Sequence, residues 1–325
     1  MEKYNFTVSE SEIGIRIDKF LSEKFKEIKP EVTRSKIQNL LDNKLIECDG
    51  RTDLNSSQKT KINQHFSISL TNTQQLSITP KEIAFKIIFE DDDLMVIDKP
   101  PYLTVHPGNG NQDHTLLNAL LHTHQNKLSQ IAGEFRAGIV HRLDKDTSGL
   151  MLIAKNDLCH LRLSEMLRDR IIKRSYLAMI YGVMEPKFGT INTDIERSRV
   201  NRLKMRIVKN GKRNAITHYQ TLEIFANNLA SLVECQLDTG RTHQIRAHFE
   251  AKKHSLIGDQ LYNSAKKNLG KDLSDNLKKI LQDFKRQALH SYKIEFTHPI
   301  NHQFLSFKID LPDDLEQLYQ ALKNG

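Results

Sequence analysis

The 325-residue sequence predicts an α+β fold with a small N-terminal domain and a larger C-terminal one. Helix-like and strand-like segments are mixed without strict strand–helix–strand alternation, which favours a mixed sheet over a doubly wound one. A polar stretch with Pro80, at about residues 71–83, is typical of a linker. We therefore expect one domain over residues 12–75 and a second over residues 84–325.

The N-terminal domain is predicted to contain two amphipathic helices followed by short strands. Apolar side chains recur at helical spacing from Ile17 to Phe25, and Pro30 ends that helix. Thr33 is expected to cap a second helix, whose apolar face is formed by Ile37, Leu40 and Leu41. Strand-like residues follow at 45–50 and 66–70.

The polar side of these two helices is basic. Its members are Arg16, Lys19, Arg34, Ser35, Lys36 and Gln38. Such a face suits RNA phosphates, although a solvated charged surface has the same pattern. The whole chain carries a formal charge of +8, which favours a polyanionic partner.

The C-terminal domain begins with two strand-like segments, residues 86–89 and 94–97, and a helix that Thr115 opens. Buried strands are expected at residues 137–140 and 150–154 because both runs are short, aliphatic and bounded by polar residues. A helix over residues 157–170, a strand over 231–237 and a helix capped by Thr242 complete the predicted elements.

Bulk composition excludes several classes of protein. No apolar run approaches the ~20 residues of a membrane helix, and the N-terminus has no apolar signal core. The three widely spaced cysteines form neither a disulfide framework nor a zinc pattern, so a reducing cytoplasm is expected.

Residues 141–149 (HRLDKDTSG) are an unusually polar gap between two expected strands, where catalytic side chains are often placed. Asp144 and Asp146 suggest acid/base work on glycosides, but their surroundings are basic and the chain has no Trp. His141 and Asp144 lack the further ligand that a metal site needs. A carboxylate acting on RNA among cations fits better, and a turn capped by Asp144 is the structural alternative.

Family resemblance distinguishes these alternatives. Residues 138–150 (GIVHRLDKDTSGL) closely resemble the signature of the RluA-type pseudouridine synthases. Three further motifs of that family occur in order, at residues 98–108, 173–178 (KRSYLA) and 239–246 (TGRTHQIR). In front of them, residues 16–21, 33–38 and 48–50 resemble the S4 RNA-binding domain. The resemblance implies the pseudouridine synthase fold, with a largely antiparallel central sheet flanked by helices and loops.

The resemblance also implies a role for each site residue. Asp144 matches the catalytic aspartate, which attacks the uridine or takes a ribose proton. Tyr176 matches the tyrosine that packs against the target base, and Arg246 the partner of the aspartate. Arg142 matches the arginine that fills the space of the flipped base, a process that such an enzyme needs. Arg241 is assigned to a phosphate or structural contact.

Other expectations follow from the same resemblance. His141 is expected to hold the loop near RNA, and Arg16, Arg34 and Lys36 to bind RNA in the first domain. No cofactor or metal is required. Residues 106–111, 117–122, 215–219 and 286–290 are similar to the family branch that modifies 23S rRNA of the large ribosomal subunit, so helix 69 is the expected substrate. The protein is expected to be a cytoplasmic monomer, and a non-catalytic RNA-binding or ribosome-assembly factor is the alternative function.

Overall fold

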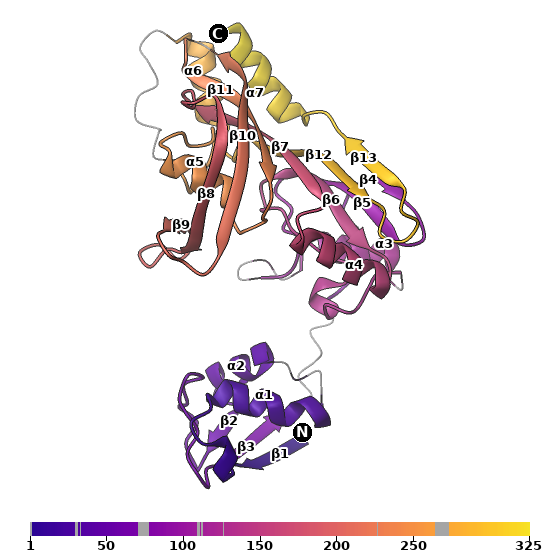
Figure 1. The fold of residues 1–325 in the computed structure, drawn as a ribbon, viewed down its shortest axis with the longest axis vertical. Coiled ribbons are helices and arrows are strands. Elements are labelled where there is room, and N and C mark those ends of the chain that lie inside the picture. Colours follow the sequence, from indigo (N-terminus) through magenta and orange to yellow (C-terminus); the bar gives the residue numbers. More distant parts are fainter. Residues whose placement is uncertain are drawn as a thin grey trace. The chain divides into compact units, whose positions relative to one another are not determined.

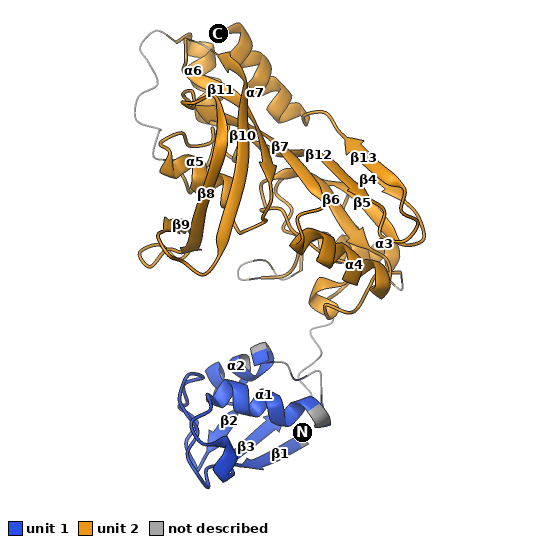
Figure 2. Ribbon diagram, viewed as in Figure 1, with its two compact units in different colours: residues 1–77 blue, residues 78–325 orange. Residues whose placement is uncertain are grey.

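The chain is divided into two compact units, residues 1–77 and 78–325, which Figure 2 distinguishes by colour. This computed structural model describes residues 2–29, 32, 34–70, 78–108, 111, 113–125, 127–225, 227–263 and 273–325. Of the expected linker, residues 71–77 lie outside the described residues. Residues 78–83 belong to the second unit, where Ile78 and Ile83 pack against the core.

Unit 1 consists of a three-stranded antiparallel sheet covered by two helices (Figure 1). Its elements are β1 (Glu2–Thr7), the 3-10 helix η1 (Glu10–Glu12), α1 (Ile17–Ile28), α2 (Arg34–Asp42), β2 (Ile46–Cys48) and β3 (His65–Leu70). The strand order is β1-β3-β2, and β1 was not predicted. Both helices bury the apolar stripe seen in the sequence. The expected helix end at Pro30 and cap at Thr33 lie outside the described residues.

Unit 2 is built on one large mixed sheet. Its strands are β4 (Lys86–Glu90), β5 (Leu94–Lys99), β6 (Ser148–Ala154), β7 (Lys173–Tyr181), β8 (Phe188–Arg197), β9 (Met205–Val208), β10 (Asn214–Phe225), β11 (Ala230–Leu237), β12 (Leu289–Thr297) and β13 (Phe304–Lys308). The order is β4-β5-β6-β12-β7-β11-β10-β8-β9, with β13 on β12. Only the β6–β12 pair is parallel among the described strands, so the predicted α+β class with a mixed sheet is confirmed.

The helices of unit 2 are α3 (Leu116–His124), η2 (Glu134–Arg136), α4 (Asp157–Arg168), α5 (Gln244–Ala251), α6 (Asp275–Asp283) and α7 (Asp313–Asn324). Of these, α3 and α4 pack on opposite faces of the β5–β6 region, whereas α6 and α7 pack against β7, β10 and β11 (Figure 1). In β5, Met95 and Ile97 join the core that contains the α3 leucines, while Leu94 and Val96 join the core beneath α4. Burial on both faces explains why this strand is continuously apolar.

The expected strand at residues 137–140 is wrong. This segment is buried but forms only one bridge, between Ile139 and Ile153. Gly138 has φ +71°, and the Ile139 N–H donates to the Arg136 carbonyl, so a tight turn replaces extended backbone. The run leads directly into the polar 141–147 loop.

No helix among the described ranges is both long enough and apolar enough to cross a membrane.

The close approach of β6 and β12 at Gly149 can be tested by substitution. A Cβ atom there would lie 2.7 Å from the Ser291 nitrogen and closer still to its carbonyl oxygen, and φ is +115°. We expect Gly149→Ala to lower the free energy of unfolding by about 3 kcal/mol or more, because collision and backbone strain combine. Urea denaturation of the full chain measures it.

Gly108→Ala is the matched control, since its added Cβ would meet no atom within 4 Å. We expect it to change stability by less than about 0.5 kcal/mol. A Gly149→Ala protein as stable as the wild type would contradict the strand packing described here.

Candidate active site

A pocket of about 470 Å³ in unit 2 contains the residues that the motifs single out. Its walls are formed by the end of the 137–147 segment, the start of β7, the 237–243 loop and the start of α5. Asp144, Tyr176 and Arg246 all line it, although they are up to 102 residues apart in sequence. Its size is ordinary for a binding site that admits a small organic group.

The loop that carries Asp144 is held through its backbone. The Lys99 ammonium, fully buried, donates to the Lys145 carbonyl at 3.0 Å. The Arg286 guanidinium donates to the Asp146 carbonyl at 3.1 Å and is itself paired with Asp314. Because these anchors use carbonyl groups, they do not occupy the Asp144 carboxylate.

Asp144 is ion-paired with Arg246. The Arg246 Nη1 lies 3.0 Å from the Asp144 Oδ2, as the resemblance implies. On its other side, Arg246 donates from Nε and Nη2 to the two oxygens of buried Asp259, at 2.6 and 2.9 Å. Burial alone would raise the pKa of Asp144, but the charges of His243 and Arg246 hold it below its usual value. Asp144 is therefore a carboxylate at neutral pH.

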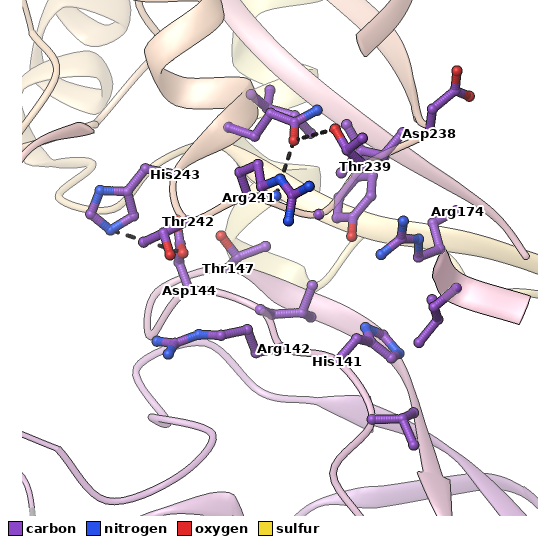
Figure 3. A pocket seen from close by; sticks show the side chains of 18 of the residues that line it. His141, Arg142, Asp144, Thr147, Arg174, Asp238, Thr239, Arg241, Thr242 and His243 are labelled. Carbon is purple, nitrogen blue, oxygen red and sulfur yellow. Dashed lines mark hydrogen bonds and ion pairs between the residues drawn. The ribbon is translucent and has the colours of Figure 1, made fainter. Parts of the chain in front are cut away.

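His243 is a site residue that the sequence analysis did not find. Its Nε2 lies 3.9 Å from the Asp144 Oδ1 (Figure 3). Its Nδ1 is 3.1 Å from the Tyr262 hydroxyl. His243, not Thr242, is the N-cap of α5, so the predicted cap is wrong. The loop is closed instead by the Gln244 side chain, which accepts from the Arg241 N–H and the Thr239 hydroxyl.

Tyr176 lies in β7, between Cys235 of β11 and Ser291 of β12. The ring is 4% exposed, and burial raises the pKa of its hydroxyl above the ordinary value of 10. Tyr176 is therefore a neutral phenol in the lining of the pocket that also contains Asp144.

Three more predicted residues line the same pocket in different ways. Arg142 is exposed, and its Nη1 is held 3.1 Å from the His106 Nε2. His141 accepts the Leu152 N–H at its Nε2, so it ties the loop to β6 as expected. Arg241 is exposed and donates from Nε to the Asn214 carbonyl.

The pocket has a strong excess of positive charge. Its acidic members are Asp144 and Asp238, whereas its arginines are Arg136, Arg142, Arg168, Arg170, Arg174, Arg241 and Arg246. Such a lining favours a polyanion.

In unit 1, two of the predicted RNA-binding residues share one acid. Arg16 and Arg34 both donate to Asp18, with shortest distances of 3.0 and 2.9 Å, and Gln38 donates to it at 2.8 Å. Asp18 is fully buried, which would raise its pKa, but these hydrogen bonds hold the pKa well below its usual range. Arg16 and Arg34 stay about half exposed, and Lys36 is exposed.

One group of three possible metal ligands occurs in the described part of the chain, at Asp91, Asp93 and His298. None of them lines the pocket. The His298 Nδ1 accepts the N–H groups of Ile300 and Asn301, so the ring proton is on Nε2, which faces Asp91 at 3.0 Å. That imidazole has no free lone pair for a metal.

Sequence reasoning missed Asp259, Tyr262 and His243. Tyr262 stacks under the Arg246 guanidinium at 5.0 Å and is fully buried. Asp259 follows Gly258, which has φ +73°, and the glycine is the one local sign of a special turn there. The short motif at residues 239–246 contains His243, but its spacing does not reveal which side chain turns toward Asp144.

Comparisons with known proteins agree with this geometry. A sequence model described as RNA pseudouridylate synthase matches residues 93–251. A Nitrosomonas europaea protein named "Ribosomal large subunit pseudouridine synthase D" is 40% identical over 98% of this chain and 87% of that protein. A protein of the same name from Zymomonas mobilis is 38% identical over 97% of this chain and 96% of its own length.

A solved human structure, titled "Human RNA Pseudouridylate Synthase Domain Containing 4", is similar with a TM-score of 0.55 and 25% identity. The match covers 73% of this chain and 92% of that one, and it confirms the predicted fold. The segment that the family model matches contains Asp144, Tyr176 and Arg246. The chain therefore belongs to the family of RNA pseudouridine synthases.

Proposed function

We propose that this protein converts specific uridines of large-subunit ribosomal RNA into pseudouridine, with Asp144 as the catalytic carboxylate. The observation that carries the proposal is the Asp144–Arg246 ion pair in an arginine-rich pocket that Tyr176 also lines. The substrate class is supported by the names of the two bacterial relatives, which are similar over nearly the whole chain.

In the proposed reaction, the Asp144 carboxylate attacks the target uridine or takes a proton from its ribose. Either step breaks the bond between the ribose and N1 of uracil, after which the base turns and rejoins the ribose through carbon 5. Arg246 keeps Asp144 ionised and oriented. Tyr176 packs against the base, and its neutral hydroxyl serves the proton transfer. No atom is gained or lost, so the reaction is an isomerisation.

The target uridine must leave its stack to reach Asp144, because a base inside a duplex is inaccessible. Arg142 suits the role of a wedge, since it is exposed at the pocket and held by His106. Stacking on an aromatic ring contributes ~1–3 kcal/mol per base, which Tyr176 supplies. Arg241 and the other rim arginines are assigned to RNA phosphates, whose binding is salt-dependent.

Unit 1 is proposed as an S4-like module that binds RNA. Arg16 and Arg34 are positioned by the same buried carboxylate, Asp18, and keep part of their guanidinium groups exposed. Two cations fixed by one anion leave a net positive surface, which Lys36 extends. Helix 69 of 23S rRNA as the target, and a cytoplasmic monomer as the state of the protein, stay predictions.

The first test compares Asp144→Asn with Asp146→Asn, its neighbour in the same loop. We expect Asp144→Asn to lower the rate of pseudouridine formation on unmodified large-subunit rRNA at least about 10³-fold while RNA binding persists. Asp146→Asn should retain most activity. Pseudouridine mapping in a strain lacking the gene, with and without each variant, locates the target uridines.

A non-catalytic assembly factor gives the opposite result. In that case, wild-type protein forms no pseudouridine, and Asp144→Asn complements a deletion strain as well as the wild type does. Pseudouridines lost outside helix 69 would correct the target while leaving the reaction intact.

The second test follows stability with pH. The folded pKa of Asp144 is below its unfolded value of about 3.9, so its ionised form stabilises the fold above that pH. The stability difference between wild type and Asp144→Asn should be constant from pH 5 to 8 and should fall as pH decreases below about 4. Urea denaturation measures it. A difference that grows on acidification would show that the Asp144 pKa is raised.

The third test concerns Arg142. We expect Arg142→Ala to slow pseudouridine formation more on a hairpin that stacks the target uridine than on an unstructured strand of the same sequence, because unstacking costs a few kcal/mol. Arg136→Ala is the control, since it also removes an arginine from the pocket lining. Single-turnover rates of pseudouridine formation on both RNAs measure the two losses. Equal losses for Arg142→Ala on the two RNAs would exclude the wedge.

A further inference from the structure

Two buried hydrogen-bond donors in the pocket have no partner among the described residues. They are the Arg174 Nε and the His141 Nδ1. Buried polar groups are nearly always paired, so each unpaired one calls for an explanation. Figure 3 shows Arg174 and His141 next to each other on one side of the pocket, with Asp144 and His243 on the other side.

The free His141 nitrogen is a donor. The Leu152 N–H points at Nε2 with a distance of 2.9 Å, so Nε2 must offer its lone pair. Burial and the nearby Arg174 charge lower the pKa of His141 to about 3, so the ring is neutral. A neutral imidazole with an accepting Nε2 carries its proton on Nδ1.

Arg174 is a buried cation without an ion-pair partner among the described residues. It is 5% exposed, and no carboxylate of the described chain lies within 4 Å of it. Asp238 of the pocket lining attracts the Arg174 charge without forming an ion pair with it, and the Asp238 Oδ2 lies 3.1 Å from the His218 Nε2. A Cβ atom on Gly240 would lie 2.9 Å from the Arg174 Nη1, so the guanidinium rests directly against that glycine. The side chain is therefore packed in place before any ligand arrives.

We propose that Arg174 and His141 form a subsite for one phosphodiester group of the substrate RNA, next to the nucleotide that enters the pocket. A planar guanidinium matches two phosphate oxygens, and the adjacent imidazole N–H adds a third donor. A phosphate is favoured over a uracil carbonyl because it also neutralises the unpaired buried charge. This inference rests on the proposed function and names a contact of the same site.

The subsite explains why Arg174 is buried without an ion-pair partner, which a purely structural role does not explain. A buried arginine whose only task was stability would be paired, because an unpaired buried charge destabilises the fold. Arg286 shows this pattern in the same unit, since Asp314 accepts two of its N–H groups. The N–H donors of Arg174 are instead left for a ligand that is present only in the complex with RNA.

The test uses three synthetic RNA hairpins with the helix 69 sequence. One has native linkages, and the others carry a neutral methylphosphonate on the 5′ or the 3′ side of the target uridine. Equilibrium binding and single-turnover pseudouridine formation are measured for wild type, Arg174→Gln and Lys173→Gln. Lys173 is the matched control, because it lies beside Arg174 in β7 but is exposed and does not line the pocket.

We expect one of the two neutral linkages to weaken wild-type binding about tenfold. Arg174→Gln should lose a similar factor on native RNA and nothing further on that modified RNA. Lys173→Gln should show the same sensitivity to the neutral linkage as the wild type. Arg174→Met should unfold at the same or a higher urea concentration than the wild type, which a structural arginine would not allow.

Two results would overturn the subsite. One is that Arg174→Gln stays as sensitive as wild type to both neutral linkages. The other is that Arg174→Met loses stability and binds native RNA normally once folded. If wild type forms no pseudouridine but the binding losses coincide as described, the proposed function fails and the phosphate subsite stands.

Discussion

The active site depends on one guanidinium that bridges two carboxylates. Arg246 enters from the first turn of α5 and binds Asp259 with two hydrogen bonds, which leaves Nη1 for Asp144. Removing one partner from such a buried set costs about 3–5 kcal/mol, because a charge is then left uncompensated. The ring of Tyr262 under the guanidinium limits its motion further. Because Arg246 belongs to α5, the position of this helix determines where the Asp144 carboxylate can lie. The hydrogen bonds of Gln244 fix the loop that leads into the helix.

The loop around Asp144 is fixed in a complementary way. Lys99 has three backbone carbonyls as partners, from Pro100, Leu103 and Lys145, and burial lowers its pKa to about 7. Binding carbonyls rather than carboxylates keeps the loop in place without engaging the Asp144 carboxylate, the proposed catalytic group. The close β6–β12 pairing at Gly149 holds the far end of the same loop. A backbone held at both ends of the loop is what precise positioning of Asp144 requires.

Local sequence patterns predicted the parts of the fold that local forces determine. The helical stripe of α1, the Thr115 cap of α3 and the apolar run of β6 were all read correctly, because each depends on neighbours within a few residues. The contacts of Asp259 and His243 were missed, since they join segments whose proximity arises only after folding. Residues 137–140 failed for a different reason: their composition suits a strand, but Gly138 allows a turn that keeps the same side chains buried.

The contrast between two buried arginines in one pocket links stability to function. Arg246 is hydrogen-bonded to two acids of its own chain, Asp259 and Asp144. These interactions stabilise the folded protein whether or not RNA is present. Arg174 has no carboxylate at ion-pair distance and an unpaired Nε, so at the proposed subsite it gains its hydrogen bonds only when the RNA phosphate binds. Binding energy kept for the complex can be used to draw a nucleotide out of its stack, whereas energy already used in the free protein cannot. The same residue type therefore serves pre-organisation at Asp144 and substrate capture on the opposite side of the pocket.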